Sequence, residues 1–399
     1  MIVESGPVAV VLHAQRTAYG VVRSVANLGG TTVVADVEAT PLFASRLVSE
    51  AILIPPLKPD DSQSLLEALC EIGRNYMQLD GKPVLFSGRD DYTIFFAENS
   101  EVLSTYFAFS SEHRLEHLRR VTDKTCLPAL AGLAGVKVPK TMTQEAGDSH
   151  ILASLSLPVI VKPAIKNEPH RSAEKSAFRL RVCHTREELL DALTLLRSAC
   201  IRFVAQELVD GNDTSLFTVG VFARDGVVTR GSVAQKLRQF PPGNGECSLG
   251  QTVEDPGLLQ QAQAVVGAAE LSGIAQLEFK RDSSGMDFLI EINPRVWSWH
   301  EIHRFNGADL VGAALGQPAL PTTQGSMKRV RWHFFWMDLL HNVILERNVG
   351  VWDFLFEALK SKLQAFWAPR DPGVFFRHSV SSIRFIRRYT STSTSKQHC

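Results

Sequence analysis

The chain has 399 residues, with 42 Lys+Arg against 42 Asp+Glu, 45% hydrophobic and 21% charged residues, which is typical of a globular protein of two or three domains. A formal charge of zero excludes the basic excess with which dedicated nucleic-acid binders replace counterions on phosphate. No run of about 18 apolar residues occurs, so we expect no spanning helix.

Cysteine usage and the first residues bear on the cellular compartment. The 6 cysteines are far apart and form no CxxC pair, which indicates reduced thiols rather than a zinc site or a disulfide framework. The N-terminus carries an acidic Glu4 and no basic segment ahead of an apolar run, so we expect no signal peptide. These features favour a cytoplasmic protein.

The first 110 or so residues alternate between strand-like and helix-like segments. The run PVAVVL at 7–12 is almost wholly apolar and rich in β-branched residues, which is typical of a strand buried on both faces. The next segments, in order, are a helix, a strand, a helix and a strand, at 18–28, 31–34, 65–77 and 83–87. This order predicts a Rossmann-like parallel sheet, although no GxGxxG motif is present.

The middle of the chain predicts helices mixed with antiparallel strands. Residues 113–135 are helical in pattern, and LPVIVKP at 157–163 is a compact strand bounded by prolines. Thr185 with Glu188 forms a capping box that predicts the start of a helix ending near Cys200. Further strands are expected at 203–208, 214–223 and 226–234. This part is therefore α+β, whereas the N-terminal part is α/β.

Residues 275–297, AQLEFKRDSSGMDFLIEINPRVW, predict a β-hairpin whose turn is DSSG. Side chains alternate between the two faces of a strand, so each strand has one core face. The apolar side chains expected on the core face are Leu277, Phe279, Phe288, Ile290 and Ile292.

The opposite face of this hairpin is predicted to carry three oxygen ligands, Glu278, Glu291 and Asn293. Residues of opposite parity share a face when an even-numbered loop joins an antiparallel pair. Two carboxylates and an amide on stiff strands suit a hard cation such as Mg²⁺ with phosphate ligands, and no soft ligand is present to attract zinc. The alternative is a polar face exposed to solvent, but the combination EINPR favours a metal site.

The string LIEINPRVW, preceded by LEFKRD, resembles the metal-binding signature of the ATP-grasp superfamily. Other matching elements occur in the family's order over residues 115–320, including a TDK segment, the strand LPVIVKP and the hinge-like QELVDG. The resemblance implies an ATP-grasp fold in which these elements contact the phosphates, adenine and ribose of ATP. The implied nucleotide-binding residues are Lys124, Lys162, Gln206, Glu207, Val209 and Asp213.

The loop that follows Lys162 departs from the family's pattern. Most ATP-grasp proteins have a glycine-rich loop there, whose backbone amides close over the phosphates, but AIKNEPHRSAEKSAF at 164–178 contains no glycine. The chain resembles a branch of predicted carboxylate-amine ligases in which a lysine of this loop faces the nucleotide. Lys175 is the expected lysine, and Lys166 and Arg171 are competing candidates.

Further basic residues are expected at the reacting centre. Lys236 and Arg238 have the spacing to project from one face of a strand. The resemblance places them, with Arg295, at the γ-phosphate or the acyl phosphate; without it, exposed basic residues on a strand edge are the alternative. His300 and His303 form HEIH, which is not the HExxH zinc motif, so we expect a substrate-pocket or structural role.

Aromatic residues become frequent from about Met327, and their helical spacing predicts a packed core rather than a cofactor or membrane site. Arg384, Arg387 and Arg388 alternate with apolar residues, which indicates either a weakly membrane-seeking helix or, as we favour, an amphipathic helix packed on the body. The expected domains are a Rossmann-like N-terminal domain at 1–114, an ATP-grasp domain at 115–322 with a hinge near 203–211, and a helical C-terminal extension at 323–399.

The resemblance implies an ATP-dependent ligase that uses ATP and Mg²⁺, for which Mn²⁺ can substitute. A small-molecule carboxylate would be activated as an acyl phosphate, with ADP and phosphate as products, and an amine would attack it to form an amide on a small amino-acid-like molecule. The alternatives are a carboxylase that works through carboxyphosphate and a non-catalytic, regulatory nucleotide-binding protein. A homodimer through the N-terminal half is a family-level expectation.

Overall fold

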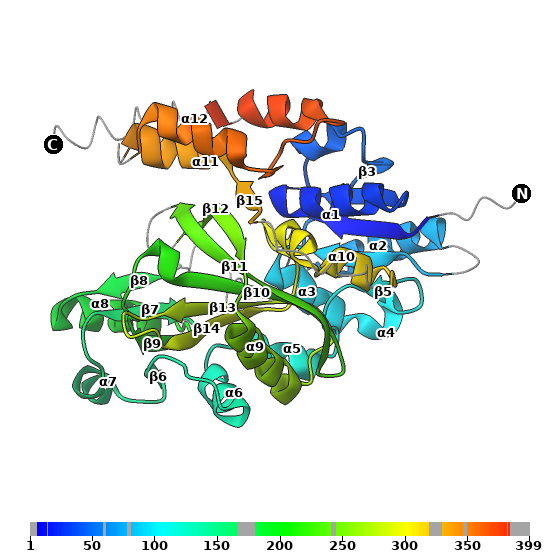
Figure 1. The fold of residues 1–399 in the computed structure, drawn as a ribbon. Coiled ribbons are helices and arrows are strands. Elements are labelled where there is room, and N and C mark those ends of the chain that lie inside the picture. Colours follow the sequence, from blue (N-terminus) through cyan, green and yellow to red (C-terminus); the bar gives the residue numbers. More distant parts are fainter. Residues whose placement is uncertain are drawn as a thin grey trace, which may run out of the picture.

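The computed structural model describes residues 6–13, 15–58, 61–77, 81–165, 180–240, 245–318, 329–345, 349–380 and 382–383. Within these residues the chain forms three β-sheets with helices packed around them (Figure 1). The predicted residues Lys175, Lys166 and Arg171 lie outside the described residues, and so do Arg384, Arg387 and Arg388.

The first sheet is five-stranded and parallel, in the order β3-β2-β1-β4-β5. Its strands are β1 (Val8–Leu12), β2 (Thr31–Asp36), β3 (Glu50–Leu53), β4 (Val84–Ser87) and β5 (Ala108–Phe109). The neighbouring helices are α1 (Arg16–Asn27), η1 (Pro41–Ala44), α2 (Gln63–Tyr76), α3 (Asp90–Glu98) and α4 (Ser100–Leu103). Alternate residues of β1 enter two different cores, Val11 with α1 and Val10 with α2 and α3, which explains why the whole strand is apolar.

The second sheet is four-stranded and antiparallel, in the order β6-β9-β7-β8. It contains β6 (Thr141–Thr143), β7 (Val159–Pro163), β8 (Arg181–Cys183) and β9 (Phe203–Glu207), and it packs with α7 (Asp148–Ser154) and α8 (Arg186–Ser198). The predicted cap of α8 is confirmed, because the Thr185 hydroxyl accepts a hydrogen bond from the Glu188 amide at 3.2 Å. The Glu188 carboxylate accepts from the His184 amide at 2.7 Å, which completes the cap.

The helical segment expected at 113–135 is divided into two helices, α5 (Leu115–Thr122) and α6 (Leu127–Ala134). Asp123 ends α5, because its carboxylate accepts hydrogen bonds from the amide of Thr125 at 2.9 Å and from its hydroxyl at 2.7 Å. Such an Asx turn competes with the helical hydrogen bonds of the backbone. As a result Lys124 stands in a turn between the two helices.

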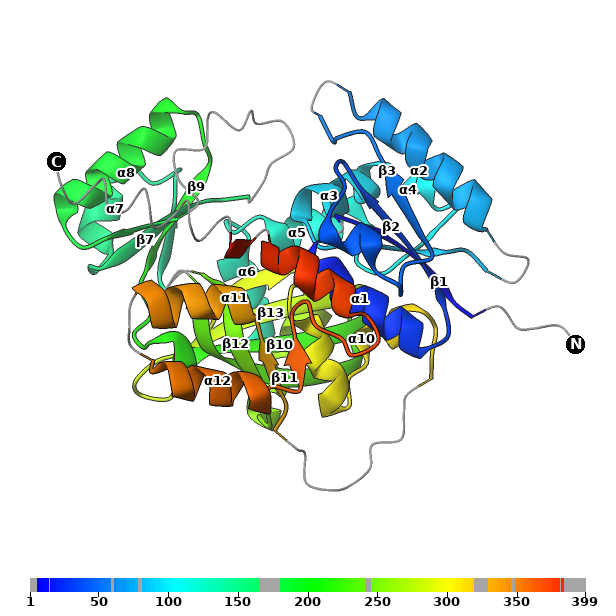
Figure 2. The same ribbon diagram turned by 90° about the horizontal axis from the view of Figure 1, so that it is seen from above.

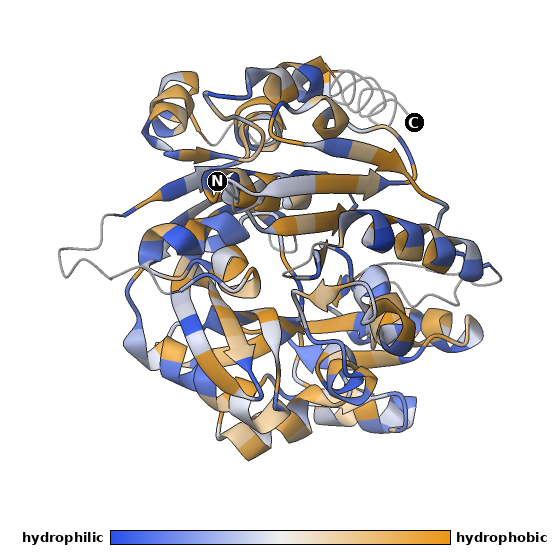
Figure 3. Ribbon diagram, turned by 90° about the vertical axis from the view of Figure 1, so that its right-hand side faces the viewer, coloured by the Kyte–Doolittle hydropathy of each residue, from blue (hydrophilic) through white to orange (hydrophobic). Residues whose placement is uncertain are grey.

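The third sheet has seven strands in the order β14-β13-β10-β11-β12-β15-β16, and only its last pair is parallel. Its strands are β10 (Leu216–Arg224), β11 (Val227–Phe240), β12 (Glu246–Val253), β13 (Gly273–Arg281), β14 (Asp287–Asn293), β15 (Arg331–His333) and β16 (Leu363–Gln364). Helix α9 (Pro256–Ala269) packs on it together with α6 (Figure 1). In Figure 3 the strands contain long hydrophobic stretches, as expected for buried sheets.

The predicted hairpin is present as β13 and β14, but its core face differs from the prediction. A β-bulge lies between Glu278 and Phe279, so that Phe279 pairs with Leu289 instead of Ile290. Leu289 is fully buried, whereas Ile290 and Phe288 are only partly buried. The prediction for these two residues is therefore wrong, because a bulge adds one residue to a strand and reverses its alternation.

The last described part of the chain covers both the parallel sheet and the seven-stranded sheet (Figures 1 and 2). After η4 (His300–Asn306) and α10 (Leu310–Ala314) it contains α11 (Phe335–Asp338), a π-helical stretch η5 (Leu339–Leu345), α12 (Val351–Lys360) and a helical segment at 372–380. Arg23 of α1 donates hydrogen bonds to the carbonyl oxygens of Gln364 at 2.7 Å and Trp367 at 3.1 Å. Among the described residues, no helix has the length and apolar character needed to cross a membrane.

Asp371 fixes this C-terminal part to the parallel sheet. Its buried carboxylate accepts hydrogen bonds from the Tyr19 hydroxyl at 3.1 Å, from the Arg46 amide at 3.1 Å and from the Ser45 hydroxyl. The three donors come from residues more than 300 positions earlier in the chain. A single carboxylate thus joins the two ends of the described chain.

We expect Asp371→Ala to lower the free energy of unfolding by about 3 kcal/mol, because it leaves buried donors without an acceptor. Urea denaturation measures this loss. Asp191→Ala, on the exposed face of α8, is the matched control and should change stability by less than about 0.5 kcal/mol. Equal effects of the two substitutions would show that Asp371 does not hold the segment.

Candidate active site

The centre of the candidate site is a pair of glutamates on neighbouring strands. Glu278 of β13 and Glu291 of β14 are direct partners in the antiparallel register, and Gln276 and Asn293 form a second pair on the same face. Direct partners in such a pair have Cβ atoms about 5 Å apart. The prediction that Glu278, Glu291 and Asn293 share one face is confirmed. We call the side of the hairpin that carries these three residues the glutamate face.

Three lysines from separate segments converge on this face. Lys236 of β11 places Nζ 3.2 Å from Oε2 of Glu278. Lys124, in the turn between α5 and α6, places Nζ 3.5 Å from Oε1 of Glu291. Lys162 of β7 lies in the four-stranded sheet, yet its Nζ is 3.5 Å from the Ile290 carbonyl oxygen in the seven-stranded sheet. The face therefore lies where the two sheets meet.

Lys162 and Lys236 differ in how firmly they hold their charge. Burial and the neighbouring Lys124 lower the pKa of Lys162 to about 8, and the attraction of Glu291 and Glu278 offsets this only in part. Burial also acts to lower the pKa of Lys236, but the adjoining Glu278 outweighs it and the pKa is raised. Lys162 therefore gives up its proton more readily than Lys236 does.

Arg295 follows β14 and connects the glutamate face to the parallel sheet. Its guanidinium donates to both carboxylate oxygens of Asp90, the first residue of α3, and to Oδ1 of Asn293 at 3.0 Å. Burial acts to lower the pKa of Arg295, but Asp90 reverses this and the pKa is raised. Asp90, Asn293 and Glu291 also line a small cavity together with Thr122, Lys124 and Ile292.

Sequence reasoning missed two members of this cluster. Gln276 donates from Nε2 to Oε1 of Glu278 at 3.0 Å and accepts from the Asn293 amide at 3.2 Å, so it fixes both side chains. Its position two residues before Glu278 could have identified it through strand alternation. Asp90 lies just beyond the carboxyl end of a parallel strand, where ligands of α/β proteins usually bind, and that position was the available signal.

Arg238 is held in a different environment from Lys236. The register of β11 against β12 shifts between these two residues, which interrupts the alternation behind the prediction that they share a face. Arg238 donates from Nε to Oδ1 of Asp338 at 2.8 Å, and its Nη2 donates to the other oxygen. Asp338 ends α11 and was not identified from the sequence.

Asp338 is fully buried and accepts from three further donors. These are the Ser248 hydroxyl at 3.0 Å, the Asn342 amide at 2.7 Å and His333 Nε2 at 2.8 Å. Burial acts to raise the pKa of this carboxyl, but His333 and Arg238 outweigh it and hold the pKa well below its usual range. The C-terminal helices are therefore joined to β11 by a charged network.

The residues predicted to contact adenine and ribose lie at the connection between the two antiparallel sheets. Gln206 and Glu207 end β9, Val209 follows in the connection, and Asp213 begins the 3-10 helix η3 (Asp213–Ser215). The side chains are engaged: Gln206 donates to the Thr141 hydroxyl at 2.8 Å, and Asp213 accepts from the Gln239 side chain at 2.7 Å. Backbone groups of this connection therefore remain the expected contacts for a base.

The two histidines after β14 belong to the core. His303 Nδ1 pairs with the Ser232 hydroxyl at 2.8 Å, and His300 Nδ1 donates to the Trp297 carbonyl oxygen at 2.6 Å. Burial lowers the pKa of His300 to about 4 and that of His303 to about 3. Both side chains are thus neutral near pH 7, as expected for structural residues.

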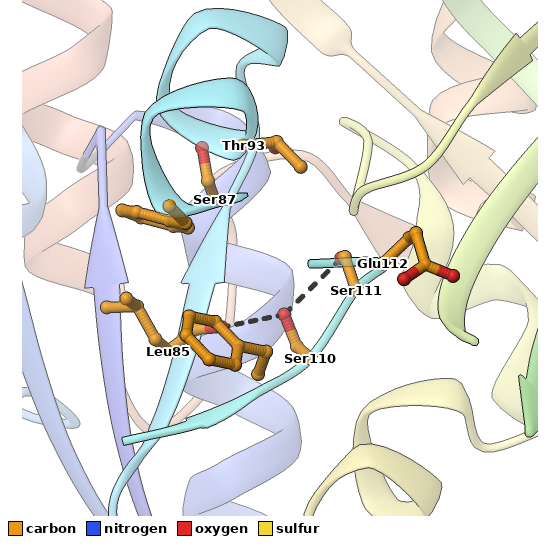
Figure 4. Close-up of a pocket in the computed structure, with 8 residues that line it drawn as sticks. Leu85, Ser87, Thr93, Ser110, Ser111 and Glu112 are labelled. Atoms are coloured by element: carbon orange, nitrogen blue, oxygen red, sulfur yellow. Dashed lines mark hydrogen bonds between the residues drawn. The ribbon is translucent and has the colours of Figure 1, made fainter. Parts of the chain in front are cut away.

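A second small cavity lies beyond the carboxyl ends of β4 and β5 (Figure 4). It is lined by Leu85, Ser87, Thr93, Phe96, Phe109, Ser110, Ser111 and Glu112. Two of its polar groups already have partners, because the Ser110 hydroxyl donates to the Leu85 carbonyl at 2.8 Å and Glu112 pairs with Arg114 at 2.8 Å. The polar side chains of this cavity therefore hold the local backbone together.

The glutamate face fits a hard cation only if other ligands contribute. In the part of the chain that the structure describes, no three His, Cys, Asp or Glu side chains gather as a metal-binding group. Glu278 and Glu291 supply two carboxylates, and the Asn293 amide a third oxygen. A divalent cation with oxygen ligands takes about six, so phosphate oxygens and water would have to complete the shell.

Several solved structures share the fold of this chain. N5-carboxyaminoimidazole synthetase from Staphylococcus aureus, complexed with ADP, has a TM-score of 0.60 at 14% identity over 87% of this chain and 86% of its own. The L-amino acid ligase from Bacillus licheniformis has a TM-score of 0.59 at 14% identity over 82% and 78%. The biotin carboxylase–beta-gamma-ATP complex from Campylobacter jejuni has 0.59 at 15% over 79% and 72%.

No protein-family model and no curated protein matches the sequence. The structural likeness nevertheless shows that the chain has the ATP-grasp fold, as the motifs from Lys124 to Arg295 implied.

The Asp338 network predicts a specific loss of stability in acid. The pKa of Asp338 in the folded protein lies below the unfolded value of about 4. The charged carboxylate therefore stabilises the fold above pH 4, and this stabilisation is lost as the pH falls. We expect Asp338→Asn to lower the free energy of unfolding at pH 7 by about 3 kcal/mol. The variant should also lose less stability than the parent protein between pH 7 and pH 3. Urea denaturation across this range measures both effects, and parallel curves would contradict the assignment.

Proposed function

We propose that the chain is an ATP-dependent ligase that activates a carboxylate for attack by an amine. The observation that carries the proposal is the pair Glu278 and Glu291, faced by lysines from three separate segments. Such a face suits a metal-bound polyphosphate, because carboxylates bind the cation while lysines meet phosphate oxygens. The fold supports this proposal, since the structural neighbours include complexes with ADP and with an ATP species.

Glu278, Glu291 and Asn293 are the proposed ligands of Mg²⁺, which when bound neutralises phosphate charge and aligns the phosphates for transfer. Lys124 and Lys236 pair with these carboxylates in the structure. In the proposed complex the same two lysines pair with phosphate oxygens. The site thus exchanges one set of charge pairs for another, which avoids burying an unpaired charge.

The other proposed site residues would bind the nucleotide or compensate charge at the reacting centre. Backbone groups near Gln206, Glu207 and Val209 would bind adenine, and Asp213 would meet the ribose. Lys162 and Lys175 would bind phosphates; Lys175 lies outside the described residues, so its role rests on the sequence alone. Lys236, Arg238 and Arg295 would offset the charge that develops at the reacting centre.

The proposed reaction has two steps. A carboxylate oxygen of the acid attacks the γ-phosphorus, the bond to the bridging oxygen breaks, and ADP leaves, which gives an acyl phosphate. The amine nitrogen then attacks the acyl carbon, loses a proton, and expels inorganic phosphate. The protein contributes alignment and charge compensation rather than a covalent intermediate.

Carboxylation through carboxyphosphate is the second candidate. It is favoured by the fact that a biotin carboxylase and an N5-carboxyaminoimidazole synthetase are among the chains with this fold. Bicarbonate would then replace the organic acid in the first step. Bicarbonate-dependent ADP release in the absence of any organic acid distinguishes this candidate from the ligase.

We expect ADP and phosphate to be released only when a suitable acid and amine are both present. A panel of amino acids paired with carboxylic acids, assayed for ADP release, tests this. AMP and pyrophosphate as products would refute the proposed chemistry. Glu291→Gln should lower turnover at least about 100-fold, whereas Glu254→Gln, an exposed residue next to β12, should have little effect.

The low pKa of Lys162 predicts that nucleotide affinity depends on pH. Phosphate binds the charged form, so MgADP should bind with near-constant affinity well below pH 8 and lose up to about tenfold in affinity per pH unit above it. Calorimetric titration measures the dissociation constant. Lys162→Arg keeps its charge at high pH and should flatten the profile, whereas Lys82→Arg, far from the site in sequence, should not. Identical profiles for all three proteins would contradict the role of Lys162.

A further inference from the structure

Helix α12 turns an apolar face toward solvent. Its exposed apolar residues are Val351, Trp352, Leu355, Phe356 and Leu359, and these positions fall on one side of a helix with 3.6 residues per turn. Trp352 is 83% exposed, Phe356 57% and Leu359 86%. Phe354, on the opposite side, is fully buried. An exposed stripe that includes Trp and Phe is unusual on a surface helix and marks a contact surface.

The helical segment at 372–380 repeats this arrangement. Val374 is fully buried, whereas Phe376, Val380 and Ile383, which follow at helical spacing, are 62%, 52% and 39% exposed. We predicted that the aromatic residues of the C-terminal part form a packed core. Only one side of each helix is packed in this way, and the other side is exposed. In Figure 3 the helices at the top of the molecule mix hydrophobic and hydrophilic colours along their length.

The two helices belong to one layer. Phe335 of α11 packs against Phe354 of α12 at a ring distance of 5.1 Å and against Phe375 of the last helix at 6.2 Å. This layer is at the top of Figure 1, and Figure 2, which views it from above, shows α12 and the last helix in front of the sheets. We call the exposed apolar residues of these two helices the C-terminal face.

The exposed charge around the C-terminal face is mainly positive. Of the residues that the structure describes at 349–383, the exposed basic ones are Lys360, Lys362, Arg370 and Arg377. The acidic residues of this stretch are the exposed Asp353, Glu357, which pairs with Arg331, and the buried Asp371. Lys360 places Nζ 3.9 Å from the ring centre of Phe356, directly beside the exposed stripe.

We propose that the C-terminal face docks on an anionic membrane surface. Exposed Trp, Phe and Leu side chains next to Lys and Arg are the combination with which interfacial helices bind anionic lipid headgroups. Helix α12 has 10 residues, about half the length of a spanning helix, so it lies in the interface. The local positive charge favours this occupant over a second copy of the chain, whose own C-terminal face would repel it.

The proposal is independent of the ligase reaction, because none of the proposed site residues contributes to the C-terminal face. Arg238 of β11 pairs with Asp338 of α11, and Asp338 is fully buried, so this pair is not part of the exposed stripe. Loss of membrane binding in a variant with full nucleotide affinity would therefore separate the two functions.

Flotation of the full-length protein with vesicles tests the proposal. We expect binding to phosphatidylcholine vesicles with about one third phosphatidylserine, and at least tenfold weaker binding to pure phosphatidylcholine or at high salt. Replacement of Trp352, Phe356 and Leu359 by Ser should lower binding at least tenfold. The matched control replaces Leu53, Leu133 and Val227, which are 64%, 78% and 65% exposed elsewhere, and should bind like the parent protein.

A second variant keeps the test independent of any folding defect. Lys360→Glu with Arg370→Glu alters only exposed charges and should weaken binding to the anionic vesicles. Failure of the parent protein to float, or equal losses in the face and control variants, would overturn the proposal. Concentration-dependent dimers that the face variant abolishes, without vesicle binding, would assign the face to a second copy. Binding that appears only after removal of residues 384–399 would assign it to that segment of the chain.

Discussion

The antiparallel pairing of β13 with β14 places two carboxylates, Glu278 and Glu291, directly opposite each other. Like charges at opposite positions destabilise a sheet, so this pairing needs compensation. The structure provides it through Lys236 at 3.2 Å and Lys124 at 3.5 Å. A pair of acidic residues that requires cations to be stable is also a pair that can accept a metal ion, and the candidate site follows from this one constraint.

The compensation has consequences for the whole architecture, because each partner comes from a different part of the chain. Lys162 extends from the four-stranded sheet, and Lys124 stands where Asp123 ends α5. Arg295 is fixed by Asp90, the first residue of α3, which follows strand β4 of the parallel sheet. The three sheets therefore meet around the same charged cluster. This arrangement explains how a chain with a formal charge of zero can concentrate charges of both signs at one place.

Much of the arrangement of the candidate site was predictable, because local rules determine it. The strand period placed Glu278, Glu291 and Asn293 on one face, as the register shows. Motif order named Lys124 and Lys162 as candidates, and the structure brings both to that face. The bulge after Glu278 was not predictable from alternation, and it moved Leu289 into the core in place of Ile290. Alternation describes a regular ladder, and a bulge is decided by packing across the whole sheet.

Contacts between distant segments were also beyond the sequence. Nothing near Arg238 indicates that Asp338, 100 residues later, would bind it, and nothing near Asp90 indicates Arg295. Helical spacing correctly indicated apolar faces in the C-terminal helices, but not that Trp352 and Leu359 would face solvent. Spacing shows which residues share a face; only the tertiary structure shows what covers it.

A crystal structure of the protein with ADP and Mn²⁺ tests the central claim most directly. We predict an anomalous peak for Mn²⁺ within coordination distance of carboxylate oxygens of Glu278 and Glu291, with the ADP phosphates beside Lys124 and Lys162. Mn²⁺ bound away from both glutamates, or ADP bound outside the junction of the two antiparallel sheets, would contradict the proposed site.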